Sequence, residues 1–339
     1  AQFNEPRGIA VDGAGNVFVA DSGNHTIRKV TPAGVVTTLA GMAGQGGFAD
    51  GTGSTARFWS PAGLLMDGDG SVLVADRSNG RIRRVSPEGV VTTLTAWGGA
   101  PAEFGGPTGV AKDASGNIYV GERWAVAKLT STGVLTILAG TPYQNGTNDG
   151  TGADARFVGV KGLASDAAGN LWVTDEGTIR SVSSDGVVTT IAGSWVWAGC
   201  QDGTGADARF DQPAGIVRAS DGTLLVADSN NSGLRRVTPA GVVTTFVGGA
   251  RRPGSSDGEG RLARFDSPSG MAFDSLGYAF VADEGNSTIR KVSPSGMVTT
   301  LAGLAGSPGS DDGTGSAARF SAPGGVAVDT AGVVLIADT

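Results

Sequence analysis

Residues that most enzymes use for acid–base, nucleophilic or zinc chemistry are scarce in this chain of 339 residues. It has one histidine, His25, and one cysteine, Cys200. A zinc site built from several His ligands cannot form, and a Ser–His–Asp triad would depend on His25 alone. Cys200 has no second His to activate it as a nucleophile. We therefore expect no catalytic residue, no metal ion and no cofactor.

Gly-rich acidic turns are the next candidates, because carboxylates bind Ca²⁺. The motif DGTG recurs at Asp50, Asp149, Asp202 and Asp312, with the variant DGEG at Asp257. Calcium needs six to eight oxygen ligands, whereas each of these turns offers about one carboxylate. A structural role is favoured, in which the Asp, or the Arg that follows each turn, is tied to the neighbouring blade of the fold.

Aromatic side chains could bind a partner, because exposed rings stack on sugars and anchor protein interfaces. All six Trp residues lie between Trp59 and Trp197. The alternative is that these rings pack their own loops onto the fold. The candidates for ligand or partner binding are Trp97, Trp124, Tyr143, Trp195 and Trp197.

Four sequons of the Asn-x-Ser/Thr type could carry N-linked glycans if the protein is eukaryotic and secreted. They begin at Asn24, Asn145, Asn230 and Asn286. Three of them coincide with a turn that recurs along the chain, so internal repetition alone can also account for them.

Seven matching units organise the sequence. Each begins near a Phe and reads approximately ARF-x-x-P-x-GIAVD-x-x-GN-VFVAD, then N-x-TIRKV and GVVTTLAG. The first unit has four short apolar runs, at 8–12, 17–21, 26–30 and 35–40, that are rich in Val, Ile and Thr. Turn residues separate these runs, and none is long enough for an amphipathic helix. The units begin near residues 1, 56, 102, 155, 208, 263 and 318.

Four short antiparallel strands repeated in this way predict an all-β β-propeller that forms one domain, residues 1–339. The run from Pro6 to Val30 also resembles the NHL repeat, with Asn24 and His25 at the dipeptide that names that family. This resemblance covers essentially the whole chain and implies the same fold. Acids at the ends of second strands, such as Asp76, and Arg residues of third strands, such as Arg83, recur in most units, which indicates an architectural role.

The seventh unit supplies only two strands, at 325–329 and 333–338. We predict six complete four-stranded repeats and a half seventh, arranged as seven sectors whose last two outer strands come from residues upstream of Ala1. The alternative is a closed six-bladed ring with a surplus strand pair that is open or engaged by a partner. In that alternative an unpaired sheet edge invites added strands, which predicts assembly through the incomplete terminal blade.

Strand order also predicts on which face of the propeller the variable loops lie. Turns between the first and second and between the third and fourth strands are short and lie on one face. The remaining turns and the long connections between units lie on the other face, which we call the long-loop face. Variable loops on a rigid scaffold commonly carry binding sites. All four sequons and the five aromatic candidates map to this face.

The favoured function is a non-enzymatic scaffold that binds a protein or glycan partner through its long-loop face, in an extracellular or otherwise extracytoplasmic assembly. Some relatives implied by the resemblance are enzymes, including a zinc lyase with His ligands, which this chain cannot reproduce. A carboxylate-metal lactonase, with Asp or Glu lining the central channel, stays open. Lys112, Lys161 and Arg218 interrupt the mostly apolar inner strands, either as a locally basic channel wall or as solvated strand ends. RNA binding also stays open but is disfavoured by the formal net charge of −7, apart from a small basic cluster at Arg251, Arg252 and Arg261. No run approaches the length of a membrane span.

Overall fold

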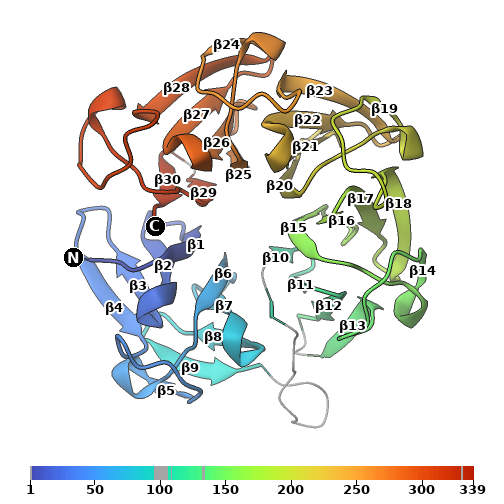
Figure 1. Cartoon of the computed structure of the whole chain (residues 1–339). Coiled ribbons are helices and arrows are strands. Elements are labelled where there is room, and N and C mark those ends of the chain that lie inside the picture. Colours follow the sequence, from blue (N-terminus) through green and yellow to red (C-terminus); the bar gives the residue numbers. More distant parts are fainter. Residues whose placement is uncertain (1, 95–105, 108, 132–133, 330) are drawn as a thin grey trace.

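The computed structural model describes residues 2–94, 106–107, 109–131, 134–329 and 331–339. Within them, six complete antiparallel sheets and one two-stranded sheet are arranged around a central axis (Figure 1). The helices of the described residues are single 3₁₀ turns, and none of these is long and apolar enough to cross a membrane. The prediction of an all-β propeller is confirmed.

Each blade runs outward from the centre in chain order, so that its first strand is innermost and its fourth is outermost. The strands of the six complete blades are β1 (Pro6–Val11), β2 (Val17–Asp21), β3 (Thr26–Val30) and β4 (Val36–Ala40); β6 (Pro61–Met66), β7 (Val72–Asp76), β8 (Arg81–Val85) and β9 (Val90–Thr93); β10 (Gly109–Lys112), β11 (Ile118–Glu122), β12 (Ala125–Leu129) and β13 (Leu135–Gly140); β15 (Val160–Ser165), β16 (Leu171–Asp175), β17 (Thr178–Val182) and β18 (Val187–Gly193); β20 (Pro213–Arg218), β21 (Leu224–Asp228), β22 (Gly233–Val237) and β23 (Val242–Gly248); and β25 (Pro268–Phe273), β26 (Ala279–Asp283), β27 (Thr288–Val292) and β28 (Met297–Gly303).

The first strand of the chain begins earlier than its apolar run predicts. We expected a start at Gly8, whereas β1 begins at Pro6, and its register with β2 shifts between Pro6 and Ile9. The same irregularity recurs in four other blades, as in the pairing of β6 with β7. In four of these five blades the extension places a Pro at the start of the innermost strand, where the bulged pairing tolerates the missing N–H of proline; the fourth blade has Val160 there.

The DGTG turns contribute a fifth strand that the sequence does not reveal by its apolar pattern. Four such strands each pair with the outermost strand of the blade that follows them: β5 (Gly51–Thr52), β14 (Gly150–Thr151), β19 (Gly203–Thr204) and β24 (Gly258–Glu259). A single 3₁₀ turn follows each of them, and a further set of 3₁₀ turns joins second to third strands. The 3₁₀ turns are η1 (Ser22–Asn24), η2 (Gly53–Thr55), η3 (Arg77–Asn79), η4 (Gly152–Asp154), η5 (Gly205–Asp207), η6 (Ser229–Asn231), η7 (Gly260–Leu262), η8 (Glu284–Asn286) and η9 (Gly315–Ala317).

The two-stranded sheet, β29 (Gly325–Val328) and β30 (Val334–Ala337), fills the sector between the sixth and first blades. The backbone N–H of Gly270 in β25 donates to Gly324 O at 3.1 Å. On the other side, a Cβ added to Gly325 would lie 2.5 Å from Arg7 O in β1. The prediction of six complete repeats and a half seventh is confirmed, and the half blade lies within the ring rather than outside it.

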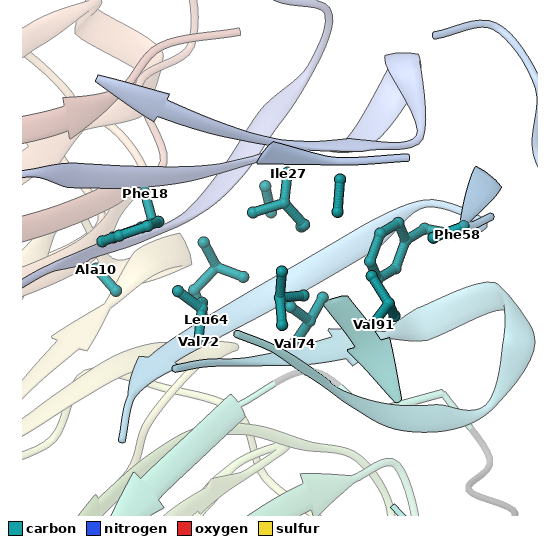
Figure 2. Packing of buried hydrophobic residues seen from close by; sticks show 12 residues of the cluster. Ala10, Phe18, Ile27, Phe58, Leu64, Val72, Val74 and Val91 are labelled. Atoms are coloured by element: carbon teal, nitrogen blue, oxygen red, sulfur yellow. The ribbon is translucent and has the colours of Figure 1, made fainter. Parts of the chain in front are cut away.

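Apolar side chains fill the space between neighbouring blades. Phe18 and Ile27 of the first blade face Leu64 and Val74 of the second, and all four are buried (Figure 2). Fully burying one such side chain stabilises the fold by roughly 1.5–3 kcal/mol. This packing holds adjacent sheets rigidly and fixes the positions of the turns at both faces.

Buried ion pairs tie the outer strands of the second, fourth, fifth and sixth blades to the DGTG or DGEG turn that precedes each of them. In the sixth blade, Arg290 is fully buried and donates to Asp283 Oδ2 at 2.8 Å and to Asp257 Oδ1 at 2.8 Å. Thr300 Oγ1 also donates to Asp257, at 2.9 Å. Burial raises the pKa of Asp283 to about 6, although hydrogen bonds from Asn286, the Asp266 N–H and Arg290 oppose the shift. The expected architectural role of these repeated residues is confirmed.

Candidate functional site

The long connections between blades lie against the turns between second and third strands, so both sets of loops form the long-loop face. Asn79 Nδ2 in η3 donates to Gly47 O in the preceding connection at 2.7 Å. Asn231 and Asn286 make the same bond, to Gly199 O and Gly254 O, each at 2.7 Å. The repeated Asn therefore fixes three of the variable connections, those before the second, fifth and sixth blades, to a rigid turn.

Two of the predicted aromatic residues meet on this face. The ring centroids of Trp124 and Tyr143 are 5.5 Å apart, and the Arg123 guanidinium lies 5.2 Å from the Trp124 ring. Trp124 is half-buried, whereas 68% of the surface of Tyr143 is exposed. Tyr143 also has a φ of 63°, an unusual conformation for a bulky residue. The turn of the third blade and the connection that leaves it thus present one aromatic pair to solvent.

The connection after β18 carries the most exposed aromatic segment among the described residues. Trp195 is 62% exposed, Val196 is 53% exposed and Trp197 is 67% exposed. Trp195 also lines a cavity of about 190 Å³ together with Thr147 and Val158. Since Thr147 belongs to the connection that holds Tyr143, the two connections are neighbours. We call Tyr143, Trp195, Val196 and Trp197 the exposed aromatic patch.

The remaining Trp residues have different surroundings. Trp97 lies outside the described residues. Trp172 is half-buried, packs against the fifth blade and has the Arg218 guanidinium 4.8 Å from its ring, so it belongs to the packing between blades. Trp59 is 52% exposed on the long-loop face and was not among the predicted site residues. Its position directly after the repeated Phe gave no signal that it would be exposed.

A cavity of about 720 Å³ opens at the centre of the ring. Its walls come from the starts of inner strands and from the turns that hold Arg77 and Glu284. Arg7 and Glu5 form an exposed ion pair there at 3.6 Å. The cavity is therefore lined by backbone atoms and by charged side chains of both signs, and few large apolar side chains face it.

An unusual backbone conformation recurs just before the inner strands, and two of the residues that adopt it, Glu5 and Ala322, line this cavity. The residue before the Pro at the start of an inner strand has a positive φ in five sectors. These residues are Glu5, Ser60, Gln212, Ser267 and Ala322, with φ between 47° and 53°. Non-Gly residues in this region cost about 1–3 kcal/mol each and gather at functional sites. The same backbone conformation thus displays four types of side chain (Glu, Ser, Gln and Ala) in five sectors.

The three polar inner-strand residues do not form a common basic wall. Lys161 lines the central cavity, and its Nζ donates to Gln212 Oε1. Lys112 Nζ instead donates to Asp67 Oδ1 at 2.8 Å, and Arg218 stacks on Trp172. These two lie at the ends of their strands beside the short turns, so of the three residues only Lys161 lines the central cavity.

The single His takes part in loop packing. His25 adopts a φ of 60° at the end of η1, and its Nδ1 accepts a hydrogen bond from the Ser60 N–H at 3.2 Å. It does not line the central cavity. Among the described residues, no three His, Cys, Asp or Glu side chains are grouped as metal ligands would be.

The four sequons differ in accessibility. Asn145 and Asn230 are exposed. Asn286 is only 8% exposed, and its amide nitrogen donates both to Gly254 O and to Asp283 Oδ2. Asn24 Nδ2 donates to Asp21. The amide nitrogens of Asn24 and Asn286 are therefore used by the fold, and that of the exposed Asn230 donates to Asp211 Oδ1 at 3.0 Å.

Comparison with known proteins supports the repeat assignment. The NHL repeat family model matches residues 3–30. Protein SUPPRESSOR OF QUENCHING 1, chloroplastic, from Arabidopsis thaliana is 25% identical over 85% of this chain and 30% of its own length. Human NHL repeat-containing protein 2 is 29% identical over 95% of this chain and 43% of its own length. The chain thus spans less than half the length of either relative.

Solved structures share the fold at low sequence identity. A streptogramin B lyase superposes with a TM-score of 0.70 and 14% identity, covering 100% of this chain and 92% of the lyase. A catalytically inactive His-to-Ala variant of virginiamycin B lyase from Staphylococcus aureus, with quinupristin, gives 0.66 and 15%, with coverage of 97% and 90%. An auxiliary nutrient binding protein from Bacteroides thetaiotaomicron gives 0.61 and 14%, with coverage of 97% and 87%.

These solved structures establish the architecture and no more, because one propeller fold carries both lyases and binding proteins. The family-model match, the named relatives and the blade structure agree with one another. The chain is therefore a β-propeller that carries an NHL repeat at residues 3–30 and resembles NHL repeat-containing proteins along most of its length.

Proposed function

We propose that this chain is a non-enzymatic binding scaffold whose long-loop face binds a glycan or protein partner. The observation that carries the proposal is the exposed aromatic patch, in which Tyr143, Trp195 and Trp197 are each more than 60% exposed. Soluble proteins expose grouped large apolar side chains mainly where they interact. The rigid blades beneath the patch supply the preorganisation that a binding surface needs.

A glycan is the favoured partner. Exposed Trp and Tyr rings offer flat apolar faces, while neighbouring loop groups can hydrogen-bond to hydroxyl groups. The similar nutrient binding protein shows that this fold is compatible with a binding role, although its low identity carries no ligand to this chain. A protein partner that inserts apolar side chains between the rings is the other outcome of the experiment.

Lyase or hydrolase chemistry has less support from the site. Replacement of one His accompanies loss of catalysis in the similar virginiamycin B lyase variant. Here the single His is engaged with the Ser60 N–H and lies away from the central cavity. The central cavity carries Glu5 and Glu284 without a third grouped ligand among the described residues.

RNA binding also has little support from the basic cluster. Arg251 pairs with Asp211 at 2.6 Å and Arg261 pairs with Asp202 at 2.9 Å. These carboxylates neutralise two of the three Arg residues, and the cluster holds no described aromatic ring of the kind that stacks on unpaired bases.

The test is binding to a panel of soluble oligosaccharides of cellulose, xylan, mannan and chitin, measured by calorimetry. We expect at least one of these oligosaccharides to bind. The double variant Trp195→Ala, Trp197→Ala should raise its dissociation constant at least about tenfold, which corresponds to roughly 1.4 kcal/mol of binding free energy. Leu276→Ala is the matched control, because Leu276 is a large side chain, 75% exposed, in a short turn of the opposite face.

A protein partner would be sought by affinity capture if no sugar binds. Equal recovery of every captured protein by the wild type and by the Trp195→Ala, Trp197→Ala variant would contradict the proposal. Loss of a captured protein with that variant, but not with Leu276→Ala, would identify the partner as protein rather than glycan.

We further propose that the protein acts outside the cytoplasm. The named relatives do not fix a compartment, since one is described as chloroplastic. If a eukaryotic secretory host glycosylates the chain, Asn145 and Asn230 should carry the glycans because they are exposed on the long-loop face. Intact mass before and after deglycosylation of the native protein tests this; an unchanged mass would remove that support for secretion.

A further inference from the structure

Three blades hold the amide of a repeated Asn in the same place. In the sixth blade, Asn286 Nδ2 donates to Asp283 Oδ2 and to Gly254 O, each at 2.7 Å. Asn79 and Asn231 make the same two bonds in the second and fifth blades. Each of these blades therefore presents a carboxylate oxygen and a backbone carbonyl to an amide N–H donor.

The fourth blade lacks this Asn because its turn between the second and third strands is shorter. Two residues, Glu176 and Gly177, join Asp175 to Thr178, whereas four residues form this turn in the sixth blade. Gly177 has no side chain, and Glu176 Oε2 accepts a hydrogen bond from Gln212 Nε2 at 2.5 Å. Neither residue therefore replaces the missing amide.

Both acceptors are nevertheless kept in the fourth blade. Asp175 is only 3% exposed, and its Oδ2 accepts from Arg180 and from no other described residue. The Gly146 N–H donates to Phe157 O at 3.1 Å, in the same bond that holds Gly254 in the sixth blade. Gly146 O is thus the counterpart of Gly254 O, and among the described residues no donor reaches it.

A cavity of about 190 Å³ lies where the Asn side chain is found in the other blades. Asp175 lines it, together with Thr147, which directly follows Gly146. Trp195 of the exposed aromatic patch lines it as well, and Val158 adds apolar surface. The cavity therefore places the amide acceptors beside an exposed indole ring.

The charges around this cavity favour a neutral donor over a cation. Arg180 also lines the cavity, and its guanidinium donates to Asp175 Oδ2 at 3.1 Å and to Asp149 Oδ1 at 2.8 Å. This guanidinium already compensates the buried carboxylate and would repel an ammonium ion at close range. An amide N–H carries no net charge, and an amide is what the other three blades supply.

We propose that the cavity is a subsite for the acetamido group of an N-acetylated amino sugar, an inference that rests on the proposed glycan-binding function. The sugar ring lies against Trp195, and the acetamido N–H donates to Asp175 Oδ2. A secondary amide has a single N–H, so the adjacent ring hydroxyl donates to Gly146 O. The acetyl methyl contacts Val158, which a hydroxyl group at the same ring carbon is too short to reach. One additional carbon that fills an apolar pocket discriminates between ligands by about 10–200-fold.

Calorimetry on the intact 339-residue protein tests this by comparing triacetylchitotriose with cellotriose. These trisaccharides differ only in having acetamido or hydroxyl groups at the same ring carbon. We expect triacetylchitotriose to bind at least about tenfold more tightly.

A turn-exchange variant fills the cavity from within. It replaces Glu176 and Gly177 by the four residues 284–287 of the sixth blade, which include the Asn, and leaves Trp195 and Trp197 in place. This variant should bind the two trisaccharides equally, with the affinity of the wild type for cellotriose. Leu276→Ala, in a short turn of the opposite face, should keep the preference for triacetylchitotriose.

Failure of the subsite and failure of glycan binding have different signatures. Equal affinity of the wild type for both trisaccharides would overturn the subsite and leave the glycan-binding proposal standing. No binding of triacetylchitotriose would also overturn it, and the remaining oligosaccharides of the panel would then show whether any glycan binds.

Two further results would overturn the subsite. One is a preference for triacetylchitotriose that persists in the turn-exchange variant, which would place the acetamido group elsewhere. The other is saturable binding of the peptide Gly-Asn-Gly without binding of triacetylchitotriose, which would assign the cavity to a protein amide. The comparison of ligands on the wild type keeps the test decisive even if the turn-exchange variant folds poorly.

Discussion

The repeated Arg–Asp pairs join separate segments within a blade, although burying their charges carries a desolvation cost. Arg290 and Asp283 are both 0% exposed, so their charges are removed from water. Such a pair stabilises a fold only when its remaining hydrogen-bonding groups are satisfied. Four donor contacts from Arg290 largely meet that condition, and they join three separate segments of the chain.

Removal of this Arg should be costly. We predict that Arg290→Ala lowers the free energy of unfolding by about 3–5 kcal/mol, because Asp283 and Asp257 lose their shared cation. Urea unfolding measures the change. Arg261→Ala is the control, since Arg261 is 59% exposed in its pair with Asp202 and should cost less than about 1 kcal/mol. Equal effects of the two substitutions would contradict this account.

Asp338 should give a pH-dependent difference in stability. Its pKa is raised to about 6 in the folded protein, above the unfolded value of about 3.9. Its favourable contribution is therefore present below pH 4 and is lost as pH rises through 6. Asp338→Asn should match the wild type in urea unfolding near pH 4 and be more stable than it at pH 7.5. A difference that is independent of pH would refute the shifted pKa.

At the scale of elements, the sequence pattern predicted the middle strands of a blade well. It missed the start of the innermost strand and the short strand added beside the outermost one. Alternation and turn residues located β2 and β3 to the residue. The start of β1 at Pro6 was missed, since a bulge lets a residue without N–H enter the sheet. Strand β5 was missed because Gly51 and Thr52 have no apolar pattern, and the pairing depends on a strand about forty residues away.

Close contact between inner strands is the element-level feature that closes the ring. A Cβ on Gly270 of β25 would lie 2.1 Å from Gly324 O, beside the seventh sheet. We predict that Gly270→Ala destabilises the fold by about 1–3 kcal/mol, because the neighbouring backbone must move. Thermal unfolding measures this. Gly13→Ala, at an open turn position, should have little effect. Equal effects would mean that the seventh sheet is not seated against β25.

At the scale of the whole molecule, the sequence predicted which loops lie on each face of the propeller, but it did not predict which side chains are exposed there. Strand order alone placed Trp124, Tyr143, Trp195 and Trp197 on the long-loop face. It could not tell which rings are exposed, since exposure depends on how each connection packs: Trp124 is half-buried and Trp197 is 67% exposed. The central cavity was also beyond sequence reasoning, because its lining comes from sectors far apart in the chain.

The central claim is that partners bind to the long-loop face at the exposed aromatic patch. Hydrogen–deuterium exchange of the intact protein, with and without the tightest-binding oligosaccharide of the panel, tests it most directly. The account predicts slower exchange in residues 141–148 and 194–199, with no change in the short turns at 220–223 and 274–277. Protection confined to those short turns, or to the sheet edge at β30, would contradict it.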